Sequence, residues 1–146
     1  MKIMLDEGAI LPTRAHPWDA GLDLYAPEDV VVMSSSSWPF GEVQIGSATI
    51  DTGVHVEIPE GYVGFIKSKS GLNVNHGLTA EGVIDAHYTG SIRVKLYNHT
   101  LDPYRFKAGD KIAQLVILPC VMPHLELVDN LSPTDRGDGG FGSTGR

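Results

Sequence analysis

Residues 91–98 read SIRVKLYN, and this stretch decides the class of fold. Its apolar side chains alternate with longer polar ones: Ile92, Val94 and Leu96 against Arg93, Lys95 and Tyr97. A period of two is the pattern of a half-buried β-strand, because successive side chains of a strand point to opposite faces of the sheet. The stretch therefore predicts a strand with one face in a core.

Shorter runs of the same kind lie on both sides of this stretch. Residues 54–58 (VHVEI) alternate in the same way and stop at the turn Pro59-Glu60-Gly61. Further β-rich runs cover residues 2–5, 30–33, 62–67, 112–118 and 124–128. We expect only one short helix, capped by Ser70 and ended by Gly77. Short strands at this spacing favour an all-β sandwich or barrel.

Composition limits the size of the protein and the class of its partners. A chain of 146 residues with 42% hydrophobic and 20% charged residues is long enough for one globular domain. The net charge of −7 argues against a nucleic-acid polymer or an anionic membrane as partner. The single cysteine, Cys120, excludes an internal disulfide. No run is long enough to span a membrane and residues 1–12 lack a signal pattern, so we expect a cytoplasmic protein.

Glycine is concentrated at the C-terminal end. Five of the 17 glycines fall in the last ten residues. Such a backbone loses much entropy when it is ordered, so residues 131–146 predict a flexible arm after a β-barrel of residues 1–130. One interpretation is a disordered end. The other is a lid over a nucleotide, because glycine amides and Arg136 can bind phosphate while Phe141 stacks on a base.

Two segments place polar residues beside predicted strand ends. In KSKSGL (67–72), Ser70 is either an ordinary helix cap or, beside Lys69, part of an anion site. In GVIDAHYTG (82–90), Asp85 either forms a turn or acts as a general base. Tyr88, three residues later, could then pack against a sugar.

Two further segments place polar residues inside predicted strands. In AGLDLYA (20–26), Asp23 lies between two leucines, and alternation predicts it on the solvated face. In GDKIAQL (109–115), Gln114 lies in an apolar strand, where its amide needs a structural hydrogen bond or a ligand.

The remaining reactive side chains predict no further site. Cys120 is expected to be a packed thiol. The six histidines lack a metal-binding spacing, and we expect them at the surface or in turns: His16, His55, His76, His87, His99 and His124.

Taken together, the five segments occur in the order and approximate spacing of the five motifs of the trimeric dUTPase family: AGLDLYA, KSKSGL, GVIDAHYTG, GDKIAQL and RGDGGFGSTG (136–145). The chain resembles that family from residue 20 to residue 145. The resemblance implies a jelly-roll β-barrel, a homotrimer with three shared active sites, and Mg²⁺-assisted hydrolysis of dUTP to dUMP and pyrophosphate. That reaction limits the incorporation of uracil into DNA and supplies dUMP for thymidylate synthesis.

The resemblance also implies a role for each matching position. Asp85 would hold and deprotonate the water that attacks the α-phosphorus, and Tyr88 would lie against the deoxyribose and exclude a 2′-hydroxyl. Asp23 would accept hydrogen bonds from waters on a triphosphate-bound Mg²⁺, with no direct protein ligand to the metal. The resemblance implies that the uracil edge is bound by Gly82, Val83 and Ile84, and that the ring of Phe141 covers the uracil. It implies phosphate contacts from Lys69, Ser70, Gly71 and Gln114. At the γ-phosphate end the implied contacts are Arg136, Gly142, Ser143 and Thr144.

Three features depart from the family pattern. Lys69 stands where arginine is usual, which keeps the charge but loses the bidentate fork. His87 replaces a frequent acidic residue and could make the site sensitive to pH. Residues 34–46 form a longer connection than is usual.

Two other functions are known or conceivable on a scaffold of this kind. The related dCTP deaminases carry a catalytic glutamate roughly where Lys95 stands, which argues against deamination. A dUTP-binding regulatory protein on the same scaffold is the main alternative.

Overall fold

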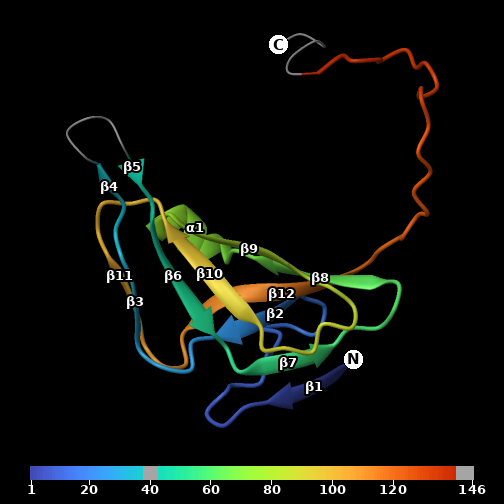
Figure 1. The fold of residues 1–146 in the computed structure, drawn as a ribbon. Helices are drawn as coiled ribbons and strands as arrows, with labels where there is room; N and C mark the ends of the chain where they lie inside the picture. Colours follow the sequence, from blue (N-terminus) through green and yellow to red (C-terminus); the bar gives the residue numbers. More distant parts are fainter. Residues whose placement is uncertain (38–42, 141–146) are drawn as a thin grey trace.

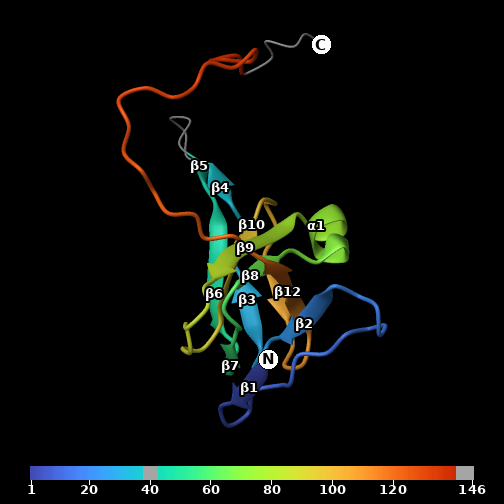
Figure 2. The ribbon, with the colours of Figure 1, turned by 90° about the vertical axis from the view of Figure 1, so that its right-hand side faces the viewer.

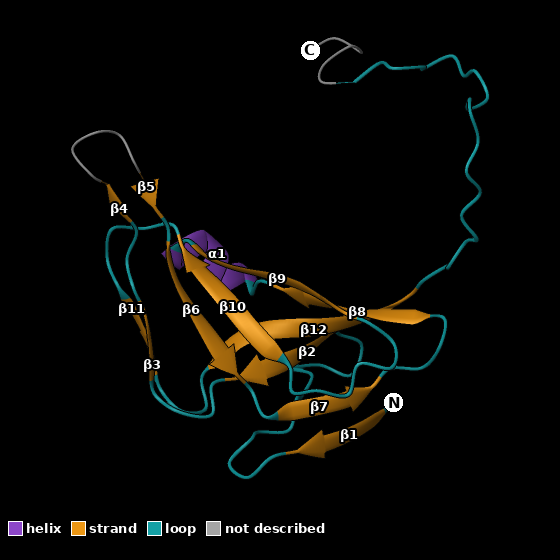
Figure 3. Cartoon of the chain, in the orientation of Figure 1, coloured by secondary structure: helices purple, strands orange, loops and turns teal. Residues whose placement is uncertain are grey.

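A curled sheet of six antiparallel strands forms the body of the protein (Figures 1 and 3). It is seen in a computed structural model that describes residues 1–37 and 43–140. Across the sheet the strands are β2 (Gly21–Tyr25), β12 (Lys111–Pro119), β8 (Tyr62–Lys67), β9 (Leu78–Ile84), β10 (Arg93–Asn98) and β6 (Gly46–Asp51). Neighbours in this order are often far apart in sequence, so most pairings are long-range.

Three two-stranded sheets complete the fold. They pair β1 (Lys2–Leu5) with β7 (Val54–Glu57), β3 (Val30–Val32) with β11 (Tyr104–Phe106), and β4 (Ser36–Ser37) with β5 (Val43–Gln44). Figure 2 shows the β1–β7 pair at one end of the body and the β4–β5 hairpin projecting from the other. This architecture confirms the predicted all-β class and is consistent with a jelly roll.

Strand β10 shows why the sequence folds in this way. Val94, Leu96 and Asn98 are buried at alternate positions, whereas Arg93, Lys95 and Tyr97 face outward. The inward side chains join an apolar core to which every strand of the large sheet contributes. The alternation predicted from residues 91–98 is therefore confirmed.

The helix lies between β8 and β9. Helix α1 (Ser70–His76) ends where predicted, at Gly77, whose φ of 60° lies in the left-handed region that favours glycine. The predicted N-cap was wrong: Ser70 is already helical, and Lys69 occupies the cap position without a side-chain cap bond. No helix in the described part of the chain has the length and apolar character needed to cross a membrane.

The chain after β12 differs most from the sequence-based expectation. Residues 124–128 alternate like a strand but form none, because no strand in the described part of the chain lies beside them to pair with their backbone. Residues 123–140 run away from the body in both views (Figures 1 and 2). Cys120 is exposed rather than packed, because it lies where this segment leaves the sheet.

Asn98 provides a test of the core. Its amide nitrogen donates to the carbonyls of Val32 and Asp102, and its oxygen accepts from the N–H and hydroxyl of Thr100 at 2.9 and 2.8 Å. Asn98→Ala leaves these buried groups unpaired, and we expect it to lower the free energy of unfolding by about 2–4 kcal/mol in urea titrations. Asn75→Ala, on the exposed surface of α1, should change it by less than about 0.5 kcal/mol. Equal stabilities of the two variants would contradict this account of the core.

Candidate active site

Strand β9 changes partners along its length. Leu78 to Ala80 pair with β10, whereas Glu81 to Ile84 pair only with β8 among the described strands. Beyond Ala80 the strands β9 and β10 diverge (Figure 1). One edge of β9 from Gly82 to Ile84 therefore has no strand partner in the described part of the chain, and its backbone groups can pair with a ligand.

Asp85 follows β9 directly, and its side chain is exposed. It lines a shallow cleft together with Tyr62, Ala86 and Met122. The turn after it is closed by the Tyr88 N–H, which donates to the Asp85 carbonyl at 3.2 Å. The turn thus places the carboxylate at the end of the unpaired edge.

His87 lies inside this turn in an uncommon conformation. Its φ of 70° is a left-handed value that a side chain with a Cβ rarely adopts. Its Nε2 lies 3.3 Å from Oε1 of Glu60, in the turn between β7 and β8. Strained residues of this kind often occur at functional sites, where the surrounding structure holds them.

Tyr88 is fixed by the residues that follow it. Its hydroxyl donates to the Ser91 carbonyl at 3.0 Å. A Cβ on Gly90 would lie 2.6 Å from that hydroxyl, so the ring lies directly across the glycine. Tyr88 as a whole remains 45% exposed, so its ring can offer a surface to a ligand near Asp85.

A second group of predicted residues gathers around the start of α1. The Gln114 amide donates to the Ser68 carbonyl at 3.0 Å, and its oxygen occupies the space that a Cβ on Gly21 would need. The Ser68 hydroxyl accepts from the Ala80 N–H at 2.9 Å. Gln114 therefore makes a structural hydrogen bond, and it holds the loop that leads to the exposed Ser70 and Gly71.

Asp23 corrects an expectation. It was predicted on a solvated face, yet it is only 4% exposed, because Lys69 and Lys111 cover its carboxylate. Lys111 Nζ lies 2.6 Å from Oδ2, and Lys69 holds Oδ1. Burial alone would raise the pKa of Asp23, but the hydrogen bonds from Lys111 and Lys69 outweigh it and lower the pKa. Two lysines on one carboxylate leave this cluster with a net positive charge.

The two groups lie toward opposite ends of β9. Ser68 is bonded to Ala80, and Asp85 follows five residues later, which is about 17 Å at 3.4 Å per residue. Reacting atoms must approach to about 3–3.5 Å. Asp85 therefore lies well beyond reacting distance of the contact between Ser68 and Ala80 in the same chain.

The predicted arm residues lie apart from both groups. Arg136 is in the segment that runs away from the body, and its Nε donates to the Gly139 carbonyl at 2.9 Å. The other predicted arm contacts lie outside the described residues: Phe141, Gly142, Ser143 and Thr144.

Asp23 is the described side chain to which the sequence assigned a metal role. Within residues 1–37 and 43–140, no three His, Cys, Asp or Glu side chains gather into a metal-binding cluster. A carboxylate can accept about four hydrogen bonds, and the lysines use two. Burial beneath two lysines makes Asp23 a poor direct ligand for a magnesium ion and leaves only contact through water.

Sequence reasoning missed His55. This residue of β7 was expected at the surface or in a turn, but its side chain is only 17% exposed. Its ring nitrogens lie 2.8 Å from the Thr89 carbonyl and 3.1 Å from the Asp6 carboxylate. The alternation around position 55 predicts the strand. The two partners of the ring cannot be read from it, because Asp6 lies 49 residues and Thr89 34 residues away in the sequence.

Comparison with known proteins gives a consistent result. The dUTPase family model matches residues 7–145. A deoxyuridine 5′-triphosphate nucleotidohydrolase of Thermobifida fusca is 44% identical over 145 residues, which cover 97% of this chain and 75% of that one. The protein of the same name from Debaryomyces hansenii is 40% identical over 143 residues, covering 96% and 83% of the two chains.

Solved structures agree with this result. The dUTPase of Staphylococcus bacteriophage 80alpha with dUPNHPP has a TM-score of 0.85 and 32% identity, covering 99% of this chain and 98% of that one. It is described as controlling the transfer of virulence genes. A mutant dUTPase from phage phi11, solved to show the coordination of a structural Mg(II) ion, has a TM-score of 0.76 and 31% identity, covering 88% and 96%.

The pairing of Asp23 can be tested by Asp23→Asn. Without the negative charge, Lys69 and Lys111 repel each other, and we expect a loss of about 1–3 kcal/mol at pH 7, moderated because both lysines reach solvent. The pKa of Asp23 is lower in the folded protein than in the unfolded chain. The stabilisation by this ion pair is therefore present above the ordinary aspartate pKa of about 3.9, and it is lost as the pH falls through the lowered pKa of the folded protein. Urea unfolding from pH 7 to pH 2.5 should show the two proteins converging in acid. Equal stability at pH 7 would contradict the pairing.

Proposed function

The chain belongs to the dUTPase family, and we propose that it hydrolyses dUTP to dUMP and pyrophosphate. One observation carries the proposal: an exposed aspartate, Asp85, stands at the end of an unpaired strand edge beside the fixed ring of Tyr88. The edge supplies hydrogen-bonding groups for a base, the ring a surface for a sugar, and the carboxylate a base for water.

Asp85 is the general base of the proposed reaction. An exposed carboxylate can accept a proton from a water that it holds. The water oxygen attacks the α-phosphorus in line, and its proton passes to Asp85. The bond from the α-phosphorus to the oxygen that bridges to the β-phosphorus breaks, so that pyrophosphate leaves with both electrons of that bond.

Recognition of the nucleoside falls to β9 and Tyr88. The backbone of Gly82, Val83 and Ile84 pairs with the uracil edge in this proposal, which the missing strand partner supports. Tyr88 lies against the deoxyribose. Because Gly90 and Ser91 fix its ring, the ring cannot easily move aside for a 2′-hydroxyl.

The phosphates are held by the group at the start of α1. Ser70, Gly71 and Gln114 contact the α- and β-phosphates, and Lys69 contributes positive charge although Asp23 already holds its amine. Mg²⁺, when bound to the triphosphate, neutralises charge and orients the phosphates. With such an ion bound, Asp23 would be the residue that accepts hydrogen bonds from its waters, through the acceptor positions that Lys69 and Lys111 leave.

We further propose that the active site is shared within a homotrimer. The separation of about 17 Å between Ala80 and Asp85 supports this arrangement, because one subunit can supply Asp85 while another supplies the phosphate contacts. The segment after β12 supports it too, since its apolar side chains lie exposed in the single chain: Val121, Met122, Leu125, Leu127 and Leu131. Docked on neighbouring subunits, it brings Arg136, Phe141, Gly142, Ser143 and Thr144 over a bound nucleotide.

The proposed reaction also suggests a place in metabolism. Removal of dUTP limits the incorporation of uracil into DNA, and dUMP is the precursor for thymidylate synthesis. Both tasks fit a cytoplasmic enzyme, in the host cytoplasm if the source is viral. The partners in this proposal are dUTP and further copies of the chain, with no nucleic-acid polymer or membrane.

A regulatory role is the second candidate. The similarity to the phage 80alpha dUTPase, which is described as controlling gene transfer, favours it. Turnover separates the two, because a pure regulator binds dUTP without releasing pyrophosphate. Deamination finds no support, since Lys95 faces outward on β10, with its Nζ 5.1 Å from the centre of the Tyr97 ring.

Asp85→Asn tests the general base. The amide keeps the shape of the side chain but cannot take a proton, so pyrophosphate release should fall by at least about a hundredfold while dUTP still binds. Calorimetry with a non-hydrolysable analogue measures the binding. Asp102→Asn, at another exposed aspartate, should retain wild-type rates. A variant at Asp85 that retains turnover would overturn the assignment.

Removal of residues 131–146 tests the arm. These residues contribute no member of the described core, so the shortened protein should sediment with the mass of a trimer and unfold as before. Its turnover of dUTP should fall by about tenfold or more, because bulk water is no longer excluded from the phosphates. Normal turnover by the shortened protein would contradict the lid, and a monomeric full-length protein would contradict the shared site.

A further inference from the structure

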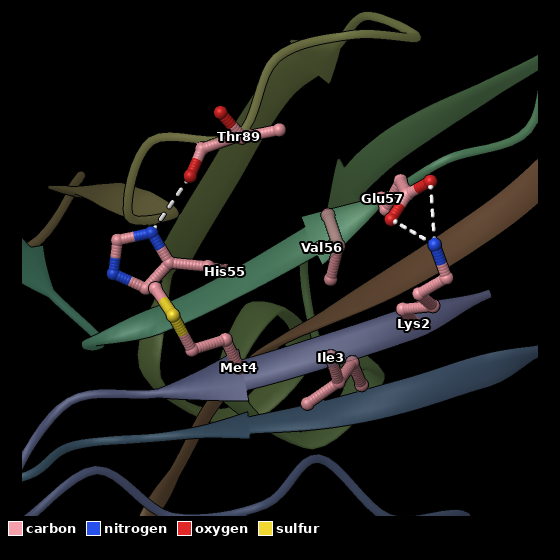
Figure 4. Close-up of a pocket in the computed structure, with 7 residues that line it drawn as sticks. All are labelled: Lys2, Ile3, Met4, His55, Val56, Glu57 and Thr89. Atoms are coloured by element: carbon pink, nitrogen blue, oxygen red, sulfur yellow. Dashed lines mark hydrogen bonds and ion pairs between the residues drawn. The ribbon is translucent and has the colours of Figure 1, made fainter.

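His55 connects two segments that are distant in sequence. It lies on β7, and its Nδ1 is 2.8 Å from the carbonyl oxygen of Thr89 (Figure 4). Its Nε2 is 3.1 Å from the carboxylate of Asp6, in the turn after β1. The ring is therefore bound on both sides, on one by the loop that carries Tyr88.

The chemistry of these two partners determines the protonation of the ring. A carbonyl and a carboxylate only accept hydrogen bonds, so each ring nitrogen must donate. A neutral imidazole carries one N–H and would turn a lone pair toward one of the acceptors. Only the doubly protonated ring satisfies both contacts.

Other charges around the ring favour the same form. Asp51 on β6 is the second carboxylate near His55, and it is bonded to Ser91 and to Arg93. Beside the ring on β1 is the uncharged Met4, and Lys2 pairs with Glu57 at the other end of the two strands (Figure 4). The hydrogen bonds to Thr89 and Asp6 raise the pKa of His55, against the opposing effect of partial burial.

The hydrogen bond between His55 and Thr89 is connected to the proposed sugar site through Thr89, Gly90 and Ser91. Thr89 lies between Tyr88, whose ring crosses Gly90, and Ser91, whose carbonyl holds the Tyr88 hydroxyl. A shift of the Thr89 carbonyl therefore moves the support of the Tyr88 ring. Asp51 holds Ser91 as well, but hydrogen bonds from Ser91 and Gly53 lower its pKa, so it stays ionised throughout neutral and alkaline solution.

We propose that His55 is a positioning residue for the contact between Tyr88 and the deoxyribose. Its imidazolium ring holds the Thr89 carbonyl and releases it when the ring loses a proton. The inference rests on the proposed contact between Tyr88 and the sugar. The direction of the pH dependence follows from the charge on the ring. The hydrogen bonds of the imidazolium to Thr89 and Asp6 are both made below the ordinary histidine pKa of about 6.5, and one is lost as the pH rises through the higher pKa of the folded protein.

The test is the pH dependence of KM and kcat for dUTP, and of selectivity over UTP, from pH 6 to pH 9.5. In the wild type, KM should rise by about tenfold on the alkaline side, and selectivity against UTP should fall with it. His55→Ala should show the raised KM at every pH. In His55→Asn the side-chain amide nitrogen is as many bonds from Cα as Nδ1 is in histidine, so it can still donate to the Thr89 carbonyl. Because the amide does not titrate, KM should stay low at every pH.

A second variant keeps His55 and moves its titration. Asp6→Asn removes the negative partner, so the alkaline rise in KM should begin at a lower pH than in the wild type. His16→Asn, at an exposed histidine, is the matched control and should keep the wild-type profile. Sedimentation and thermal unfolding verify that each variant is folded and assembled.

The outcomes separate this inference from the proposed function. A wild-type KM that does not rise in alkali, or an Asp6→Asn profile identical to the wild type, would overturn the role of His55 while dUTP hydrolysis stands. A protein that never releases pyrophosphate from dUTP would overturn the proposed function. Nitrogen NMR of the His55 ring would then test the contact with Thr89 and Asp6 by itself: two N–H groups at pH 6 support it, and one would overturn it.

Discussion

The divergence of β9 from β10 after Ala80 is the constraint on which the rest of the structure depends. Because β10 continues with β6 while β9 continues with β8, the sheet opens, and one edge of β9 from Gly82 to Ile84 has no partner among the strands that the structure describes. The backbone groups along this edge can bond to water or to a ligand, and we propose that the uracil edge of dUTP takes this place. The same opening exposes the turn after Ile84, so that Asp85 and Tyr88 stand beside that edge rather than inside the barrel.

Charge is managed locally in a protein whose net charge is −7. The buried Asp23 with its two lysines forms a positive cluster beside the loop that leads to Ser70. The carboxylate of Asp85 lies toward the other end of β9, away from that cluster. This separation keeps the proposed base from being paired with a lysine, and it is one of the observations that support the proposed shared site.

Local patterns predicted the parts of the fold that local chemistry determines. The alternation of residues 92–97 predicted β10, and the glycine at position 77 predicted the end of the helix. The burial of Asp23 was not predictable, because it depends on lysines 46 and 88 residues away. The role of His55 and the lack of a strand at 124–128 likewise depend on partners that a single-sequence pattern does not contain. The motifs identified Asp85 and Tyr88, but not the network that fixes them.

The most direct test of the account is hydrolysis of dUTP in water enriched in ¹⁸O, with mass spectrometry of both products. Attack on the α-phosphorus by a water held at Asp85 predicts one ¹⁸O atom in dUMP and none in pyrophosphate. Label in pyrophosphate would mean attack at the β-phosphorus and would contradict the placement of the base beside the sugar.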